Sequence, residues 1–415
     1  MAKAPEELYQ EREKRVSDAI QLKVPDRVPF LPFFSFFPAK YAGISFKEAM
    51  YDYDKLAEVS KKTIIDFQPD MYLNPYGLIS VGPTLEALDY KQLKWPGHGV
   101  DPNLTYQFVE GEYMKAEEYD AFLFDPSGFM IRTIFPRICG VLEPFKMLPS
   151  IPSAYYLRIV PRVAVLGIPE VAAAFKRLLK AGAEAQRMMA EARSFVEEME
   201  ELGFPTQFGS TGYAPFDYIG DFLRGTRGIM LDMYRNPDKL LEAIEKVLPI
   251  MIEGGVAAKR AGIPRVFIPL HKGAHGFMSL EQFNTFYWPT LHKLMLALID
   301  EGLTPCPLFE GDYTDRLEII KDIPKGKAIY SFEHTDIFKA KEVLGDRVCI
   351  RGNVPASLLC TGTPQEVRDY CKKLIDVVGR GGGFIMDGAI GIPDEAKPEN
   401  VRAMADFTRE YGVYH

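Results

Sequence analysis

The stretch RVFIPLHKGAHGFMSLEQFNTFYWPTLHKLMLALIDEGLTPCPLFEGD, residues 265–312, contains one repeating unit of the fold. Its first six residues are largely apolar, which is typical of a strand buried on both faces. A Ser-x-x-Gln capping box at Ser279 then predicts a helix that runs to Glu301. The apolar run from Leu303 to Phe309 predicts a second strand. The order is therefore strand, helix, strand, and polar residues follow each strand.

The same alternation continues to the C-terminus. Further strands are expected at residues 328–332, 347–351 and 383–386. Helices are expected at residues 312–321, 336–344, 363–378 and 398–411. Upstream, apolar residues at helical spacing predict a long amphipathic helix at 169–202 and another helix at 237–262.

Strands with few polar residues that alternate with helices indicate a parallel sheet covered on both faces. An open doubly wound sheet and a closed barrel both satisfy this pattern. Candidate strands at 28–31, 70–73 and 205–209 favour the barrel, and no G-x-G-x-x-G fingerprint supports a dinucleotide-binding sheet. We therefore predict an α/β fold, a (β/α)₈ TIM barrel, as a single domain over residues 1–415. An N-terminal helix at 1–24 precedes the barrel with its insertions at 25–415.

Composition excludes several classes of protein. The formal net charge of −8 argues against a nucleic-acid-binding surface, and no run of about 18 apolar residues suggests a membrane span. The charged start lacks the apolar core of a signal peptide. The five cysteines are scattered and odd in number, as is typical of reduced thiols in the cytoplasm. A cytoplasmic enzyme with no membrane contact is expected.

Polar residues follow five consecutive predicted strands, where a barrel carries its catalytic groups. They are His271 with His275, Glu310 with Asp312, Glu333 with His334, Arg351 with Asn353, and Asp387. A single polar residue in such a place is usually a loop residue or a helix cap, and Asp312 is interpreted as a cap. Several carboxylates at one mouth repel one another unless a cation, a shared proton or an arginine relieves them.

Two chemistries fit this set of residues. A mixed carboxylate and imidazole set suits Zn²⁺ or another divalent metal, with Glu310, Glu333, His334 and His271 as the candidate ligands. Metal-free acid–base catalysis is the alternative. In that case Glu310 or Asp387 would have a raised pKa, and Arg351 would hold an anionic substrate.

The N-terminal segment PFLPFFSFFPAKYAG, residues 29–43, is unusually aromatic. We interpret Phe30 and Phe33 as core residues. Phe34, Phe36 and Phe37 could wall a pocket for a flat ligand. Tyr213, in the segment FGSTGYAPF, is expected to contribute to the same wall.

Several segments resemble the uroporphyrinogen decarboxylase superfamily. They are RVSDAIQLKVPDRVPF at 15–30, the segment from Thr211 to Ile244, and the tail with GDRVCIRGNV at 345–354, GTPQEV at 362–367 and PENVRAM at 398–404. The tail is the most specific part, and the resemblance covers most of the chain. It implies a (β/α)₈ barrel, which agrees with the alternation of strands and helices.

The superfamily holds two activities. Its porphyrinogen decarboxylases carry an R-Q-A-G-R loop after the first strand, where this chain has FFSFFPAKYAG without arginine. Its zinc-dependent methyltransferases pass methyl groups to or from a corrinoid, and one branch has an H-x-C-G-D motif where this chain has LFEGD, residues 308–312. Leu308 and Glu310 thus replace the His and Cys of that motif. An oxygen-rich site suits the polarisation of an ether oxygen better than the binding of a thiol.

The leading hypothesis is a corrinoid-dependent methyltransferase of the O-demethylase type. It would move a methyl group from a methoxylated, aromatic small molecule to a corrinoid carried by a partner protein, with Zn²⁺ as the assisting metal. The alternative is a cofactor-free decarboxylase of a carboxylated cyclic substrate, with Arg351, Arg132 or Arg137 binding carboxylates and Asp387 or Asp217 handling the proton. A non-catalytic scaffold is a third class. The hypotheses allow for a homodimer.

Overall fold

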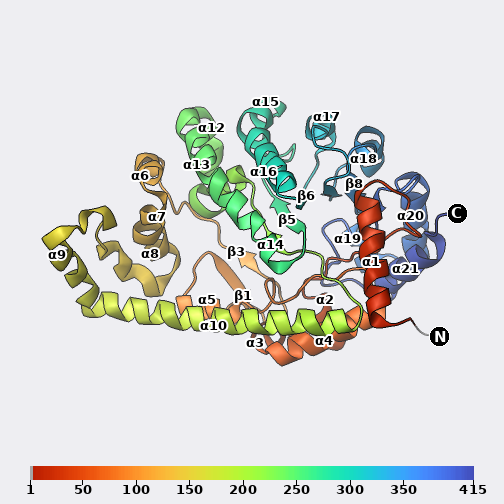
Figure 1. Ribbon diagram of the computed structural model, residues 1–415, viewed down its shortest axis with the longest axis horizontal. Coiled ribbons are helices and arrows are strands. Elements are labelled where there is room, and N and C mark those ends of the chain that lie inside the picture. The colour runs from red at the N-terminus through yellow and green to blue at the C-terminus, as the bar shows by residue number, and fades with distance from the viewer. Residues whose placement is uncertain (1–2) are drawn as a thin grey trace.

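A closed barrel of parallel strands forms the centre of the molecule. The computed structural model describes residues 3–415. Six strands pair side by side in parallel, in chain order (Figure 1). They are β4 (Ser210–Thr211), β5 (Arg265–Leu270), β6 (Thr304–Phe309), β7 (Ile329–Phe332), β8 (Cys349–Arg351) and β9 (Phe384–Ile385). This confirms the predicted strands of the second half.

Two short extended segments close the barrel between β9 and β4. The first, at 28–31, pairs with β9, because the Leu31 amide donates to the Met386 carbonyl at 3.1 Å. The second, at 70–73, pairs with the first, because the Asp70 amide donates to the Phe30 carbonyl at 2.9 Å. Its Tyr72 pairs in parallel with Thr206, just before β4. The candidate strands of the first half thus complete an eight-stranded barrel, and the fold is not an open sheet.

Helices surround the barrel on its outside (Figure 1). They are α4 (Tyr53–Phe67), α12 (Gly225–Arg235), α13 (Pro237–Val256), α14 (Ala258–Ala261), α16 (Trp288–Asp300), α17 (Leu317–Ile320), α18 (Ile337–Leu344), α19 (Ala356–Thr361), α20 (Pro364–Val377) and α21 (Pro398–Tyr411). Ser279 forms the expected capping box with Gln282, and Thr363 forms another with Glu366. The helix expected at 237–262 is divided into α13 and α14, and the one expected at 312–321 is only a single turn of 3₁₀-helix followed by α17.

A long insertion separates the second barrel strand from the third. It contains α5 (Gly82–Leu88), a small sheet of β1 (Leu93–Pro96), β2 (Gly99–Val100) and β3 (Gln107–Phe108), and the short helices α6 (Tyr119–Phe124), α7 (Pro126–Phe129), α8 (Phe135–Ile138) and α9 (Ile159–Ala164). The 33-residue helix α10 (Pro169–Glu201) returns to the barrel. In Figure 1 α9 lies at the far end of α10, away from the barrel, so the insertion ends in a projecting arm.

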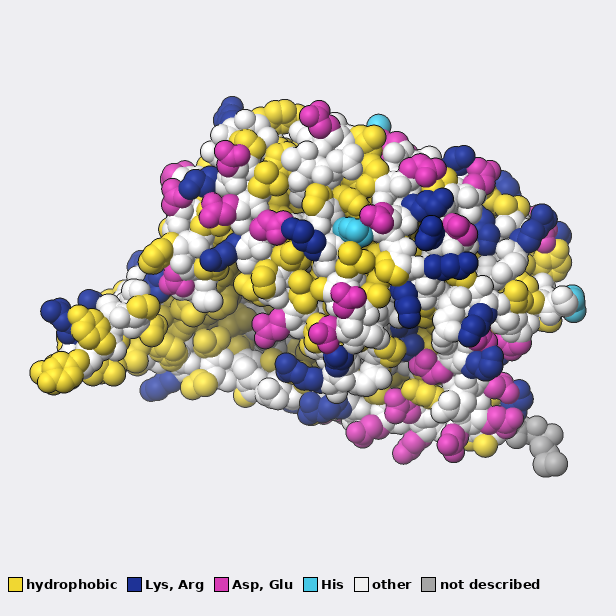
Figure 2. All heavy atoms as spheres, turned by 45° about the horizontal axis from the view of Figure 1, so that its top comes forward, with side chains coloured by type: hydrophobic (Ala, Val, Ile, Leu, Met, Phe, Trp, Pro, Cys, Tyr) yellow, Lys and Arg dark blue, Asp and Glu magenta, His cyan; other side chains and the backbone are white. Residues whose placement is uncertain are grey.

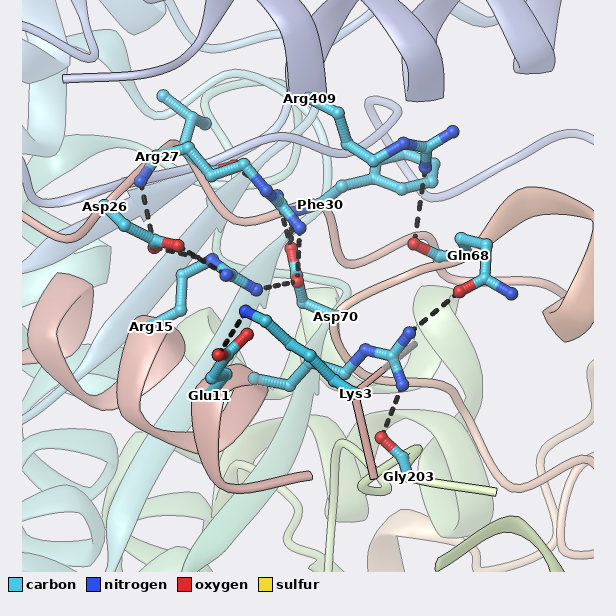
Figure 3. Close-up of polar contacts among 12 residues, drawn as sticks. Lys3, Glu11, Arg15, Asp26, Arg27, Phe30, Gln68, Asp70, Gly203 and Arg409 are labelled. Carbon is cyan, nitrogen blue, oxygen red and sulfur yellow. Dashed lines mark hydrogen bonds and ion pairs between the residues drawn. The ribbon is translucent and has the colours of Figure 1, made fainter. Parts of the chain in front are cut away.

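The N-terminal helix α1 (Pro5–Ile20) is attached to the barrel through a buried carboxylate, Asp70 (Figure 3). Arg15 donates to Asp70 at 2.6 Å, and Arg27 donates to both of its oxygens at 2.7 and 2.8 Å. The Phe30 amide donates at 2.8 Å. Asp70 is fully buried, so these donors replace the water that its charge would otherwise require. None of the helices formed by residues 3–415 has the length and apolar character needed to cross a membrane.

Candidate active site

The register of the barrel brings three strand ends to one level. Leu270 pairs with Phe309, and Phe309 pairs with Phe332. The next residue after each of these is His271, Glu310 and Glu333, respectively. The sequence prediction that these side chains converge at the C-terminal mouth is therefore consistent with the strand register, since neighbouring parallel strands end together.

His271 and Glu310 face each other at this mouth. The distance between His271 Nε2 and Glu310 Oε1 is 3.7 Å, and each side chain is about one-third exposed. On the other side of the ring, His271 Nδ1 lies 2.6 Å from Asp221 Oδ2. Asp221 also accepts a hydrogen bond from Lys272 Nζ at 2.5 Å. The imidazole is therefore held between two carboxylates, with Nε2 turned toward the more accessible one.

Asp221 was not found by the sequence analysis as a site residue. It lies on the π-helix η7 (Tyr218–Arg224), which follows β4, and not at the end of a strand. The only signal in the sequence is its place four residues after Asp217 in a segment that resembles the family. Because π-helical turns are often found at functional sites, this local geometry is itself informative.

Asp217 fixes the backbone from which His271 projects. It is completely buried and accepts hydrogen bonds from the amides of His271 and Lys272, both at 3.0 Å. The Tyr287 hydroxyl donates to it at 2.5 Å. Burial and the neighbouring Asp221 raise the pKa of Asp217 to about 6. Asp217 thus orients two adjacent side chains without itself reaching the open mouth.

The ionisation of the pair follows from this surrounding charge. Burial by itself would lower the pKa of His271, but the hydrogen bond with Asp221 and the charges of Asp217, Asp221 and Glu310 raise that pKa to about 9. Burial raises the pKa of Glu310, and the charge of His271 opposes the shift. An imidazolium beside a carboxyl group of elevated pKa results, which places a transferable proton at the mouth.

The remaining predicted metal ligands form a second pair. Glu333 Oε2 accepts a hydrogen bond from the Gly311 amide at 2.6 Å, and Glu333 Oε1 lies 3.2 Å from His334 Nε2. The His334 side chain is 71% exposed and therefore lies at the rim. Within residues 3–415 no group of three or more His, Cys, Asp or Glu side chains is arranged to hold a metal ion. The four predicted ligands are thus adjacent pairs, not one assembled site.

Arg351 and Asp387 lie deeper, inside the barrel. Arg351 Nε donates to Asp387 at 2.9 Å, and Arg351 Nη2 donates to the Leu31 carbonyl at 2.8 Å and to Gln207 at 2.9 Å. Burial raises the pKa of Asp387, and Arg351 opposes this shift. A cavity of only about 10 Å³ lies beside the pair, close to the limit for one water molecule. To bind an anionic substrate, as the sequence analysis expected, Arg351 would have to give up these internal bonds.

The aromatic N-terminal segment differs from the expectation. Phe36 stacks on Phe46 at 4.7 Å between ring centroids, while Phe34 stacks on Phe37 at 5.2 Å. All three predicted wall residues are buried in the core. Phe33, expected in the core, instead lines the small cavity together with Phe267; the two ring centroids are 5.4 Å apart.

The physical reason is that two aspartates fix the backbone of this segment. Asp387 accepts from the Phe33 amide at 3.2 Å, and Asp394 accepts from the Phe36 amide at 2.7 Å. These bonds fix the backbone of the segment whose Phe34 and Phe36 rings are buried in the core. Tyr213 does remain near the mouth. The Tyr213 side chain is half-buried, and burial together with the charge of Asp221 raises the pKa of its hydroxyl group.

Comparison with known proteins places this mouth in a family. The family model described as uroporphyrinogen decarboxylase (URO-D) matches residues 174–411, more than half of the chain. The chain belongs to the uroporphyrinogen decarboxylase family. The match covers Asp217, Asp221, His271, Glu310 and Glu333, so the mouth described above lies wholly in the family region.

Curated members of the uroporphyrinogen decarboxylase family are distant from this chain. Uroporphyrinogen decarboxylase of Methylococcus capsulatus is 27% identical over 195 residues, which are 46% of this chain and 54% of the relative. That of Chlorobium luteolum is 32% identical over 188 residues, 44% of this chain and 52% of the relative. The chain thus spans about half the length of the curated relatives it matches.

A solved structure supports the fold over almost the whole chain. A methyltransferase from Methanosarcina mazei superposes with a TM-score of 0.65 and covers 96% of this chain and 98% of its own. Its sequence identity is 16%, so the similarity establishes a shared architecture. The predicted barrel of the uroporphyrinogen decarboxylase family is therefore confirmed.

Proposed function

We propose that this protein transfers a methyl group from a methoxylated, aromatic small molecule to the corrinoid of a partner protein. The observation that carries this proposal is the pair of His271 and Glu310, held at the barrel mouth by Asp221. A methyl group that leaves an ether leaves negative charge on the oxygen, which must be neutralised by a proton or a cation. The pair supplies groups suited to that task.

The charges at the mouth favour methyl transfer over porphyrinogen decarboxylation. A porphyrinogen carries several carboxylates, which need free cations in the binding site. Here Lys272 is bound to Asp221, and Arg351 is bound to Asp387. Of the arginines considered for the decarboxylase, Arg132 pairs with Asp125 at 3.0 Å, and Arg137 pairs with Glu118 at 2.6 Å. A polycarboxylate would therefore have to break existing ion pairs.

The donor atoms at the mouth also fit a divalent metal in part. His271 Nε2 and Glu310 Oε1 are accessible and adjacent, and Glu333 is the third candidate ligand beside them. A histidine that binds zinc through one nitrogen commonly donates from the other to a carboxylate, as His271 does to Asp221. A metal bound there would displace the proton from His271 Nε2 and would act as a Lewis acid toward the ether oxygen.

The residues of this chain then have distinct tasks. Asp221 holds the His271 ring and fixes which nitrogen faces the substrate. Lys272 balances the charge of Asp221, and Asp217 holds the backbone of both residues. Without a bound metal, Glu310, whose pKa is raised by burial, would donate a proton to the leaving oxygen; as a metal ligand it would be deprotonated, and the metal would neutralise that oxygen instead. Tyr213 provides an aromatic side chain near Asp221.

Metal analysis and a methyl-transfer assay test this proposal together. We expect one equivalent of zinc per chain after reconstitution, and cob(I)alamin to become methylated when a methoxylated aromatic compound is added. The variants His271→Ala and Glu310→Gln should lower both quantities, and His292→Ala, which changes a histidine on the outer helix α16, serves as the matched control. Failure to bind zinc, with no methyl transfer to cobalamin, would contradict the proposal. Release of carbon dioxide from a porphyrinogen would instead support the decarboxylase.

A further inference from the structure

The insertion between the second and third barrel strands contacts the active site. Its outer end projects from the molecule and carries hydrophobic side chains at the surface (Figure 2). Its inner part, by contrast, consists of the small sheet of β1, β2 and β3 and the segment that continues to Met114. This inner part is bonded to the π-helix η7, which carries Asp221, the partner of His271. The contacts between the insertion and η7 therefore bear on where Asp221 lies.

Gln92, directly before β1, connects the small sheet to η7. Its Nε2 donates at 3.0 Å to the carbonyl of Phe222, the residue after Asp221. Its side-chain oxygen accepts from the Tyr90 hydroxyl at 2.8 Å, and its backbone carbonyl accepts from the Val109 amide at 2.9 Å. Gln92 is only 2% exposed. Because the amide oxygen faces a donor and the amide nitrogen faces an acceptor, the orientation of this buried side chain is fixed.

The segment after β3 adds two attachments at the same end of η7. The Met114 amide donates to the Leu223 carbonyl at 2.7 Å, and Glu112 Oε1 accepts from Arg224 Nη1 at 2.6 Å. Arg224 is buried, and its Nε also donates to Asp232 of α12 at 2.6 Å. The last carbonyls of a helix need partners of this kind. Three consecutive residues at the end of η7 are thus bonded to the insertion.

The insertion also passes very close to the junction between η7 and α12. Gly225, at this junction, has a φ of +69°, which residues with a side chain rarely adopt. A Cβ on Gly225 would lie only 3.0 Å from the Gly111 carbonyl oxygen. The next residue, Thr226, donates its amide proton to the Glu110 carboxylate. Because packed elements of a protein interior leave little free space, a shift of the insertion would be transmitted to η7.

The bonds that Asp221 makes at the mouth are sensitive to such a shift. Its carboxylate lies 2.6 Å from His271 Nδ1 and 2.5 Å from Lys272 Nζ. A displacement of about 1 Å would take both distances beyond about 3.2 Å, the usual limit of a strong hydrogen bond. The His271 ring would then lose the carboxylate that holds it.

We infer that Gln92 is a positioning residue of this active site: through the Phe222 carbonyl it fixes the end of η7, and through Asp221 it orients the His271 ring. Gln92 acts through the helix and not on the substrate. The inference deepens the proposed methyl transfer and rests on it only for the role of the ring in the reaction. The family match begins at residue 174, so this support comes from a part of the chain that the family model does not cover.

The NMR spectrum of the full-length chain with isotope-labelled histidine tests this inference. We expect the His271 Nδ1 proton, held by Asp221, to give a downfield signal in slow exchange with water, and His271→Ala assigns it. The variant Gln92→Met keeps the length of the side chain but removes both bonds of the amide group. In this variant the signal should broaden or disappear, and zinc affinity should fall about tenfold, at the lower end of the effect of groups that hold a metal-binding histidine.

The matched control is Tyr51→Phe, which removes a bond to the same small sheet at another place. The Tyr51 hydroxyl accepts from Nε1 of Trp95, in β1, at 2.9 Å. The His271 signal and zinc affinity should both stay unchanged in this control. Denaturant unfolding checks that Gln92→Met is folded. If it is not, the double variant with Tyr90→Phe takes its place, because it also removes the hydroxyl that would be left unpaired.

Three outcomes would overturn the inference. They are an unaltered chain without the slowly exchanging His271 signal, a folded Gln92 variant in which that signal is unchanged, and an equal loss of the signal in Tyr51→Phe. Failure of the proposed function is distinguishable from these outcomes. A chain that neither binds zinc nor transfers methyl groups, yet loses the His271 signal in the Gln92 variant, would contradict the proposed function and support the positioning role of Gln92.

Discussion

Buried carboxylates at the two ends of the barrel differ in how many cationic groups surround them. At the N-terminal end, two guanidinium groups and a backbone amide satisfy Asp70. At the C-terminal mouth, Asp217, Asp221 and Glu310 share one histidine and one lysine. The first network joins one carboxylate to two guanidinium groups and is largely closed to solvent, whereas the second has excess negative charge and two accessible side chains. The groups that stabilise the fold and the groups suited to chemistry therefore lie at opposite ends of the barrel, as in other barrels of this type.

The largest effect is expected at the N-terminal end of the barrel. The substitution Asp70→Ala removes the acceptor of three donors and leaves the Arg15 and Arg27 charges without their buried partner. We expect the free energy of unfolding to fall by about 3–5 kcal/mol, as measured by denaturant titration. The control Asp346→Ala changes an exposed aspartate and should shift stability by less than about 0.5 kcal/mol. Equal effects of the two substitutions would show that the Asp70 network does not stabilise the fold.

The second-largest effect is expected at Asp221, which positions His271 at the mouth. The substitution Asp221→Asn keeps the shape of the side chain but removes the charge that holds His271 and Lys272. We expect zinc affinity to fall about 10–100-fold, measured by competition with a chelator, because a carboxylate that holds the ring of a ligating histidine has effects of this size. The control Asp322→Asn alters an 81% exposed aspartate that lies 3.8 Å from His292, and should leave zinc affinity unchanged. An unchanged zinc affinity in the Asp221→Asn variant would show that Asp221 does not position His271 for zinc binding.

A smaller, pH-dependent effect on stability is expected at Asp394, in the segment that follows β9. Burial raises the pKa of Asp394 to about 6, although the Phe36 amide donates to it. The folded protein therefore holds a proton that the unfolded chain releases near pH 4, so stability is lost as the pH rises from about 4 to 6. The substitution Asp394→Asn should be neutral at pH 4 and stabilising by about 2 kcal/mol at pH 7.5 in thermal or denaturant unfolding. A variant that is less stable at pH 7.5 would contradict this.

The smallest effect is expected at the rim of the mouth. The His334 side chain is mostly exposed, and its Nε2 lies 3.2 Å from the Glu333 carboxylate. We expect His334→Ala to change zinc affinity and methyl transfer by less than about twofold, because exposed ion pairs contribute little. A loss as large as that of His271→Ala would show that His334 enters the site when ligand binds, and would restore the four-ligand arrangement predicted from the sequence.

The barrel was predictable because its strands are apolar runs with polar residues after them. The insertion was less predictable. Of its elements, α10 has apolar residues at helical spacing over a long stretch, whereas the segment at 116–167 consists of short 3₁₀-, α- and π-helical pieces. The capping residues Ser279 and Thr363 could be predicted because each side chain forms its hydrogen bond within three residues along the chain.

The site was predictable only in part. The strand-end positions of His271, Glu310 and Glu333 follow from the alternation, but which of them pair depends on packing. Asp221 lies on a helix and carries no periodic signal. The orientation of Phe33 and Phe36 depends on bonds to Asp387 and Asp394, more than 350 residues away along the chain. Such long-range hydrogen bonds cannot be inferred from local sequence.

The π-helix η7 gives this active site a sensitivity to chain length. Asp217 directly precedes this helix, and the wider π-helical turn, which accommodates an additional residue, brings Asp221, four residues later, to nearly the same side. Removing one residue between them would restore an ordinary α-helical turn and leave the two carboxylates three residues apart, about 60° short of a full turn around the helix axis. A single codon deletion could therefore disconnect the imidazole from its anchor while every residue in contact with substrate stayed the same. Diversification within such a lineage could proceed through a change of length, without any exchange of amino acids at the mouth.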